Sequence, residues 1–218
     1  MSRAIPLARW VVSSFVLAAM LMLCAGRVNG ALTAYLLICG GAGLVTAVLT
    51  DTSLDEERRE PRREEAYPNS RRGATALFLV TVIVAALDDG RFHWTALSRS
   101  TQILALPVLI LAAALQVWTM AVNPFFSSAI RIQTDHGHKP VTRGPYRFIR
   151  HPGYLAMVII MPATALALGS LMALIPALGY SGLILWRTKR EDEFLVERLA
   201  GYAEYSARVR HRLIPDFW

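Results

Sequence analysis

The segment from His138 to Tyr154, HKPVTRGPYRFIRHPGY, combines residue types that suit the binding of a charged ligand. It interleaves basic side chains with turn-forming Pro140, Gly144, Pro145 and Pro152, between two long apolar segments. Proline fixes φ and glycine permits backbone shapes that other residues avoid, so the segment should form a rigid loop. A rigid basic loop beside a membrane suits an anionic or zwitterionic ligand. The simpler interpretation is a positively charged topology anchor.

A second charged segment follows the last apolar run, where Glu191, Asp192 and Glu193 come one turn after Arg187. Apolar residues recur at helical spacing over 187–212, which predicts an amphipathic helix. One interpretation is an interfacial helix with i,i+4 pairs such as Arg187 with Glu191. The alternative is that the carboxylates turn toward the 138–154 loop, so that cations and carboxylates converge on one site.

Such a site suits S-adenosylmethionine. Its carboxylate needs N–H donors or a cation, its ammonium needs a carboxylate, and its purine needs an apolar slot with backbone hydrogen-bonding groups. The loop supplies the first and third requirements, and the Glu191 region supplies the second. The sequence has no glycine-rich strand–turn–helix pattern of the Rossmann type. A nucleotide-like cofactor would therefore bind at the loop.

The elements that must position these segments are membrane helices. Hydrophobic residues make up 54% of the 218 residues, and six apolar runs contain no Asp, Glu, Lys or Arg. The runs are Trp10–Gly26, Ala31–Leu49, Gly73–Leu87, Gln102–Val122, Pro152–Gly169 and Leu171–Trp186. The third, fifth and sixth runs are short for a span of about 20 residues. Pro162 and Pro176 suggest that the last two runs form a short kinked hairpin.

The distribution of charge predicts the orientation of these helices. The N-terminus, the 50–72 loop, the 123–151 loop and the C-terminal tail together hold 20 of the 23 Lys and Arg residues. The positive-inside rule places this side, and both termini, in the cytoplasm. The net charge of +7 then reflects topology and attraction to anionic lipid headgroups, so no nucleic-acid partner is expected.

Other features favour no separate chemistry. Cys24 and Cys39 lie within apolar runs and fit small core residues. His136 and His138 lack the Cys or carboxylate neighbours of a metal site, so no metal is expected. The 51–72 segment, with seven acids and six arginines, fits a solvated loop or short surface helix broken at prolines.

The predicted fold class is thus all-α: a polytopic membrane bundle of about six transmembrane segments with a cytoplasmic C-terminal helix. Its predicted organisation is a four-helix transmembrane module over residues 1–122, which carries the charged 50–72 loop. Residues 123–218 then form a second unit of the binding loop, the hairpin and the C-terminal helix.

Residues 125–216 resemble the isoprenylcysteine carboxyl methyltransferase family of integral membrane enzymes. The resemblance rests on GPY, RHPxY, an acidic pair and YxEY, which occur in this order with matching gaps. It implies a methyltransferase core that uses S-adenosylmethionine and acts on a lipophilic acceptor. Phospholipid N-methyltransferases and some more distant membrane reductases share a similar core.

The resemblance also implies site residues. Cofactor contacts would come from the loop and the following helix start, through His138, Lys139, Pro140, Val141, Tyr146, His151, Pro152, Gly153 and Tyr154. Glu191 matches an acidic ligand of the cofactor ammonium, and Gln133 matches a further cofactor contact. Arg187 matches an arginine that faces the methyl-accepting carboxylate. Two departures stand out: Pro140 replaces a larger apolar residue, and Asp192 replaces a second, longer glutamate.

The implied reaction is in-line displacement at the sulfonium methyl. A carboxylate acceptor is already ionised at neutral pH and needs no general base, so the protein must chiefly align two reactants. An amine acceptor would need a base, for which Glu191 and Glu193 are candidates.

Two other classes remain open. A membrane reductase could use Arg143, Arg147 and Arg150 to bind the phosphates of a nicotinamide cofactor. A non-catalytic lipid-binding protein would bind no cofactor and would tolerate changes at His151 and Glu191.

Overall fold

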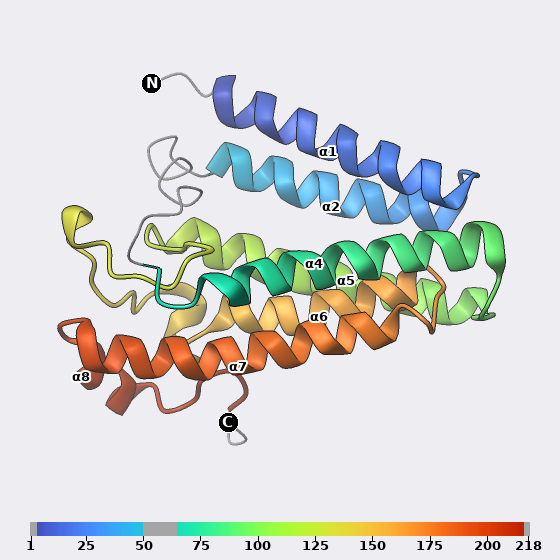
Figure 1. The fold of residues 1–218 in the computed structure, drawn as a ribbon. Helices are drawn as coiled ribbons and strands as arrows, with labels where there is room; N and C mark the ends of the chain where they lie inside the picture. The colour runs from blue at the N-terminus through green and yellow to red at the C-terminus, as the bar shows by residue number, and fades with distance from the viewer. Residues whose placement is uncertain (1–3, 50–64, 216–218) are drawn as a thin grey trace.

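A computed structural model describes residues 4–49 and 65–215, and within these ranges all the regular elements are helices (Figure 1). The long helices are α1 (Ala4–Ala25), α2 (Gly30–Leu49), α4 (Pro68–Leu87), α5 (Arg99–Val122), α6 (Pro152–Ala167) and α7 (Leu174–Arg198). The shorter ones are η1 (Asp88–Phe92), η2 (Thr134–His136), η3 (Gly144–Arg147) and α8 (Tyr202–Arg208). The predicted helical fold class is confirmed. Most of the charged 51–72 segment, with Pro61, lies outside the described residues.

In the part of the chain that the structure describes, four helical stretches are long and apolar enough to cross a membrane: Leu7–Ala25, Gly30–Leu49, Pro68–Phe92 and Arg99–Val122. The third apolar run is therefore not short, because its helix begins at Pro68, where a missing N–H costs no helical hydrogen bond. The α6 helix has only 16 residues. That α6 and α7 also cross the bilayer remains a prediction.

The last apolar run does not end at Trp186. It continues without a break into the charged segment, and α7 ends at Arg198, so the prediction of a separate helix over 187–212 was wrong. No helix-breaking residue separates the two parts, and the chain turns only at Gly201, whose φ is +79°. Pro176 lies in the first turn of α7, and Pro162 lies inside α6 without ending it.

The α6 helix lies at the centre of the bundle, packed against α5 and α7, while α4 packs against α7 and also contacts α6. Its face is rich in small residues, and Ala156, Ala163, Ala165 and Ala167 are buried. Small side chains let neighbouring helices approach closely, which is how membrane helices commonly pack. The α1–α2 pair lies along one edge of this group (Figure 1).

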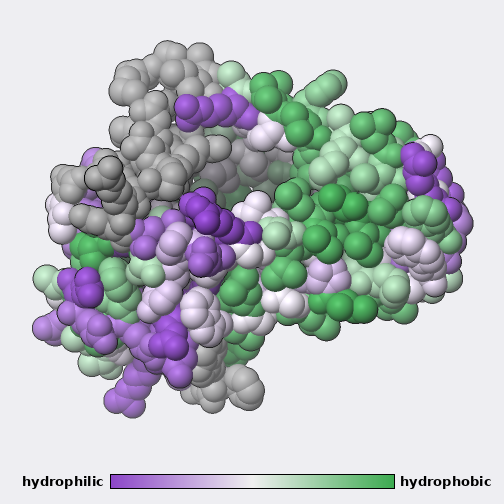
Figure 2. All heavy atoms as spheres, viewed as in Figure 1, coloured by the Kyte–Doolittle hydropathy of each residue, from purple (hydrophilic) through white to green (hydrophobic). Residues whose placement is uncertain are grey.

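The molecular surface divides into apolar and polar zones. Hydrophobic side chains cover the body of the bundle, and hydrophilic ones gather at the end formed by the α5–α6 loop, the last turns of α7 and α8 (Figures 1 and 2). Large apolar residues such as Phe15 (75% exposed), Leu37 (71%) and Leu111 (71%) face outward. A lipid environment makes such exposure favourable, so the chain is a helical integral membrane protein.

Candidate active site

The α5–α6 loop, residues 123–151, is held in place by its own side chains. Asn123 donates from Nδ2 to the Tyr146 hydroxyl at 2.7 Å, and Gln133 donates from Nε2 to the Phe125 carbonyl at 2.8 Å. The Ala66 N–H donates to the carbonyl of Ile130 at 3.0 Å, which ties the loop to the chain just before α4. The loop is therefore a fixed surface at the polar end of the bundle.

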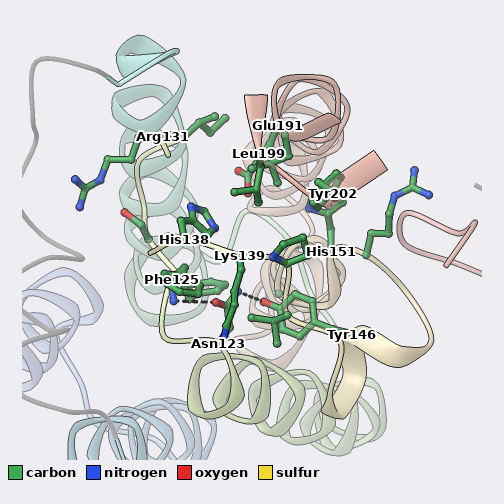
Figure 3. Close-up of a pocket in the computed structure, with 18 of the residues that line it drawn as sticks. Asn123, Phe125, Arg131, His138, Lys139, Tyr146, His151, Glu191, Leu199 and Tyr202 are labelled. Carbon is green, nitrogen blue, oxygen red and sulfur yellow. Dashed lines mark hydrogen bonds between the residues drawn. The ribbon is translucent and has the colours of Figure 1, made fainter. Parts of the chain in front are cut away.

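A cavity lies between this loop, the start of α6 and the last turns of α7 (Figure 3). Nine of the predicted cofactor residues line it: His138, Lys139, Pro140, Val141, Tyr146, His151, Gly153, Tyr154 and Glu191. The structure thus brings together the basic loop and the acidic turn of α7, although they are far apart in the sequence. The wall also contains residues that the sequence did not single out, notably Asn123, Phe125 and Arg131, and Leu199 and Tyr202 from the chain after α7.

Two predicted cofactor residues do not line the cavity. Gln133 is 4% exposed and lies behind Phe125, whose ring stacks on His138 at a centroid distance of 4.5 Å. Pro152 is buried and begins α6. Both residues support the wall of the cavity from behind.

His138 is held in its neutral form. The Gln133 N–H donates to its Nδ1 at 3.3 Å, so this nitrogen acts as an acceptor. Burial, with a smaller contribution from the nearby Arg131 charge, lowers the pKa of His138 to about 4. At neutral pH the imidazole can therefore offer an Nε2–H donor without adding a charge.

Glu191 brings a negative charge to the opposite wall. The Tyr154 hydroxyl donates to Glu191 Oε2, which fixes the carboxylate between α6 and α7. Glu193, the other candidate base, points away from the cavity and pairs with Arg190 at 3.4 Å on the surface. Glu191 is therefore the carboxylate of the acidic cluster that faces the cavity.

Asp192 does not take the place of a second cofactor-binding glutamate. It is 2% exposed, and its carboxylate accepts hydrogen bonds from Tyr202 at 3.0 Å and from Arg212 at 2.8 Å, besides a paired contact with Arg150. Although burial opposes ionisation, hydrogen bonds from His151 and Arg150 hold the pKa of Asp192 well below its usual range. The shorter side chain thus anchors a buried charge network behind the cavity.

The chain after α8 completes this network. The Arg150 N–H donates to the His211 carbonyl at 2.9 Å, and the His151 N–H donates to the Arg212 carbonyl at 2.9 Å. Arg150 also donates from Nη1 to the Val209 carbonyl at 2.8 Å. His151 Nε2 lies 3.0 Å from Asp192, so this nitrogen is already engaged, and the ring lines the cavity beside Tyr154.

Arg187 lies in a second, adjoining cleft. This cleft runs between α4, α6 and α7 and shares Ser127 and Tyr154 with the first cavity. Its other walls are mainly apolar, with Phe78, Met157, Tyr180 and Ile184, and two arginines lie at its polar end, Arg71 and Arg187.

The Arg187 side chain is 4% exposed and is held by neutral groups. Its Nη1 donates to Ser70 Oγ at 2.8 Å, and its Nη2 donates to the Ser128 carbonyl at 2.9 Å. The interpretation of Arg187 as an i,i+4 surface partner of Glu191 is therefore wrong. Within residues 4–49 and 65–215, no carboxylate lies within 4.0 Å of this guanidinium. The cleft thus holds a buried positive charge that a negatively charged ligand would neutralise.

The arginines proposed for nicotinamide phosphates are differently placed. Arg150 is 8% exposed and is committed to Asp192 and backbone carbonyls. Arg143 and Arg147 are exposed and do not line the cavity. The reductase alternative loses its phosphate-binding residues.

The donor set fits S-adenosylmethionine. Lys139 can neutralise a carboxylate, Glu191 can bind an ammonium, and Phe125 and Leu199 offer apolar surface. The enclosed volume is about 80 Å³, whereas ligand pockets usually enclose about 300–1,000 Å³. A bound cofactor would therefore have to widen the cavity by displacing side chains of its wall. Among the described residues there is no group of three or more His, Cys, Asp or Glu side chains that could hold a metal ion.

Comparison with known proteins agrees with this arrangement. A sequence model of the isoprenylcysteine carboxyl methyltransferase family matches residues 103–197, from the start of α5 almost to the end of α7. Two rice proteins, from Oryza sativa subsp. indica and subsp. japonica, are each named a probable protein-S-isoprenylcysteine O-methyltransferase. Each is 34% identical over 94 residues, which is 40% of this chain and 47% of the relative, so the chain spans about half the length of these relatives. The match thus covers the segment that contains the loop, α6 and the acidic turn of α7, which is similar in sequence to this family.

Proposed function

We propose that this protein is an integral membrane methyltransferase that transfers a methyl group from S-adenosylmethionine to the carboxylate of a lipophilic, isoprenylcysteine-like acceptor. One observation carries the proposal. Two cavities meet at Tyr154 and Ser127, one with Glu191 opposite a basic loop, the other apolar with a buried arginine at its polar end. Two reactants of different polarity can therefore meet at a shared wall.

The first cavity is the proposed cofactor site. Glu191 would bind the ammonium, and Lys139 would bind the carboxylate of the amino-acid part. Phe125 and Leu199 would contact the adenine, beside the neutral His138. Tyr154 would keep the Glu191 carboxylate oriented through its hydrogen bond.

The second cleft is the proposed acceptor site. Its apolar walls, including Phe78 and Met157, suit a lipid tail, and Arg187 would bind the acceptor carboxylate. The buried positive charge disfavours a cationic or protonated amine headgroup, so a carboxylate acceptor is preferred over the N-methyltransferase alternative. The tail would enter from the bilayer, and the cofactor would enter from the polar end.

The chemistry asked of the protein is alignment. When bound, S-adenosylmethionine would supply an electrophilic sulfonium methyl to the acceptor carboxylate, with a C–O bond replacing the C–S bond and S-adenosylhomocysteine as the leaving group. Arg187 would hold the nucleophile without donating a proton, and Tyr154 lies at the boundary where the reactants meet. Such ordering can lower a barrier by up to about 7–11 kcal/mol in well-oriented systems.

Calorimetry on the full chain in detergent tests the cofactor assignment. We expect S-adenosylhomocysteine to bind and NADPH to show no binding. Glu191→Gln should weaken S-adenosylhomocysteine binding by about tenfold or more, because a hydrogen bond to a charged group contributes about 1.5–3 kcal/mol. Glu193→Gln, a matched change on the exposed face of the same turn, should leave the affinity unchanged. Binding of NADPH alone would overturn the proposal, as would equal effects of the two variants.

A further inference from the structure

Part of the proposed acceptor cleft comes from outside the segment that matches the family. Arg71, Ala74, Thr75 and Phe78 all lie on α4 and line the cleft, whereas the match begins at residue 103. Ser70, in the first turn of α4, is uncharged, and its hydroxyl oxygen accepts a hydrogen bond from Arg187. The start of α4 therefore contributes directly to the polar end of the cleft.

Arg71 is held in a one-sided ion pair. Its Nε lies 3.2 Å from Glu65 Oε1 and 3.3 Å from Oε2, and the Glu65 side chain is only 4% exposed. The two terminal nitrogens of Arg71 have no hydrogen-bond partner among the described residues. Glu65 thus orients the Arg71 guanidinium through Nε. The two terminal nitrogens, which can donate two parallel hydrogen bonds, remain available to a ligand.

The charges at this end of the cleft do not cancel. Glu65 offsets the charge of Arg71, while Arg187 is held by a hydroxyl and a carbonyl. Glu191 also acts on Arg187, but its charge is assigned to the cofactor ammonium and is left out of the balance. The sum over Glu65, Arg71 and Arg187 is one positive charge. A headgroup with a single negative charge, such as a carboxylate, balances it.

We propose that Arg71, positioned by Glu65, is a second recognition residue for the acceptor carboxylate and that this pair sets the specificity of the cleft for a singly charged headgroup. The proposal rests on the methyltransferase function proposed above. Arg187 and Arg71 approach the headgroup from α7 and α4, so that two helices share its recognition. Glu65 lowers the net positive charge at the polar end of the cleft. A doubly charged headgroup, such as a phosphate monoester, would therefore be left partly uncompensated.

Kinetics with N-acetyl-S-farnesylcysteine, a lipophilic carboxylate, test the role of Arg71. Arg71→Gln should raise the KM for this acceptor by about tenfold or more, because a charge-assisted bond is lost. Its affinity for S-adenosylhomocysteine should be unchanged. Arg71→Lys should restore part of the loss, since a charge without the paired donors remains. Arg72→Gln, which removes the same charge from an exposed neighbouring position on α4, should match the wild type.

A second measurement tests the charge balance with Arg71 in place. Farnesyl monophosphate is used as a competitor of the carboxylate acceptor. Glu65→Gln should make this competitor several-fold more potent relative to a farnesylated carboxylate competitor, because the cleft gains a net positive charge. An unchanged ratio would overturn the role of Glu65, whether or not the Arg71 variants fold.

The outcomes separate this inference from the function on which it rests. If the wild type binds S-adenosylhomocysteine but methylates no lipophilic carboxylate, the proposed function fails. If the wild type methylates the acceptor and Arg71→Gln has a KM within twofold of it, only the role of Arg71 fails.

Discussion

Arg150 and Asp192 form a two-point ion pair inside the protein, with Nε–Oδ1 and Nη2–Oδ2 distances of 2.8 Å each. Arg150 ends the α5–α6 loop, and Asp192 lies on α7. The same carboxylate also binds Arg212 from the chain after α8. The pair therefore joins three separate segments behind the proposed cofactor cavity, and it orients His151, which lines that cavity.

Asp192→Asn should destabilise the protein strongly. Removing one partner of a buried ion pair typically costs about 3–5 kcal/mol, because the remaining charge is left uncompensated. Thermal unfolding in detergent should shift to a lower temperature, and S-adenosylhomocysteine binding should weaken because His151 loses its partner. Glu193→Gln is the control, since its exposed pairs contribute only about 0–1 kcal/mol. Equal unfolding temperatures for the two variants would contradict the structural role of Asp192.

Gly153→Ala should narrow the cofactor cavity on the side formed by the start of α6. A Cβ at this position would lie 2.6 Å from Phe126 Cε2 and 3.1 Å from Thr119 Cγ2, so the Phe126 ring, which lines the cavity, must shift. Overpacking of this kind typically costs about 1–3 kcal/mol. We expect weaker S-adenosylhomocysteine binding by calorimetry. Gly182→Ala, on α7, is the matched control, because nothing lies within 4 Å of its added Cβ. A Gly153→Ala protein with wild-type affinity would argue against this tight approach.

The sequence predicts the long helices well because their signal is local. Uninterrupted apolar runs mark α2, α5 and α6 closely, whereas α1 begins at Ala4, ahead of the run that starts at Trp10. The 138–154 loop was also found from local composition, and the structure places Lys139, Arg150 and His151 at the cavity but leaves Arg143 and Arg147 outside it.

The network around Asp192 could not be predicted in this way. Its partners Arg150 and Arg212 lie 42 and 20 residues away, and nothing in their spacing marks a contact. The same holds for Arg187 and Ser70, which are 117 residues apart. Local helical spacing instead suggested a pair with Glu191.

Acidification should weaken the cofactor site through His138. The pKa of His138 is about 4 in the folded loop, below the ordinary histidine value of 6.5, because burial and the Arg131 charge disfavour the protonated ring. The unfolded loop therefore takes up a proton on His138 between pH 6.5 and 4, whereas the folded loop does not. The contribution of His138 to the stability of the folded loop is complete above pH 6.5 and is lost as the pH falls toward 4.

Titration of S-adenosylhomocysteine affinity against pH checks this effect. His138→Gln should remove part of the decline between pH 6.5 and 4, while His136→Gln, at an exposed position in the same loop, should keep the wild-type profile. Identical profiles for all three proteins would exclude His138 as the group responsible.

Reporter fusions should place the two ends of the bundle on opposite sides of the membrane. The segments predicted to be cytoplasmic hold 20 of the 23 Lys and Arg residues. The end of the bundle that carries the site has a largely hydrophilic surface (Figure 2). A fusion at the C-terminus should report a cytoplasmic location, and an insertion in the 88–101 loop should report the opposite side. The same signal from both positions would contradict an even number of crossings.

Arg187→Lys should separate acceptor binding from cofactor binding. The guanidinium reaches Ser70 Oγ and the Ser128 carbonyl from two different nitrogens, which a single ammonium cannot reproduce at the same geometry. The charge stays, but its position beside the acceptor carboxylate does not. Because Arg187 lines only the acceptor cleft, S-adenosylhomocysteine affinity should stay within twofold of wild type, which calorimetry measures.

Turnover with a farnesylated carboxylate should fall about 10–100-fold in the same variant, as expected for the loss of a well-oriented charged hydrogen bond. Arg190→Lys provides the control, because Arg190 lies one turn along the same helix and its side chain is 46% exposed. Among the described residues, its guanidinium pairs with the surface acid Glu193 and lies over the Trp186 ring. Its turnover should equal that of the wild type. Near-normal turnover in Arg187→Lys would show that charge alone suffices at this position. A large loss of S-adenosylhomocysteine affinity would instead move Arg187 into the cofactor site, because only a residue that touches the cofactor, or holds its wall, can change that affinity.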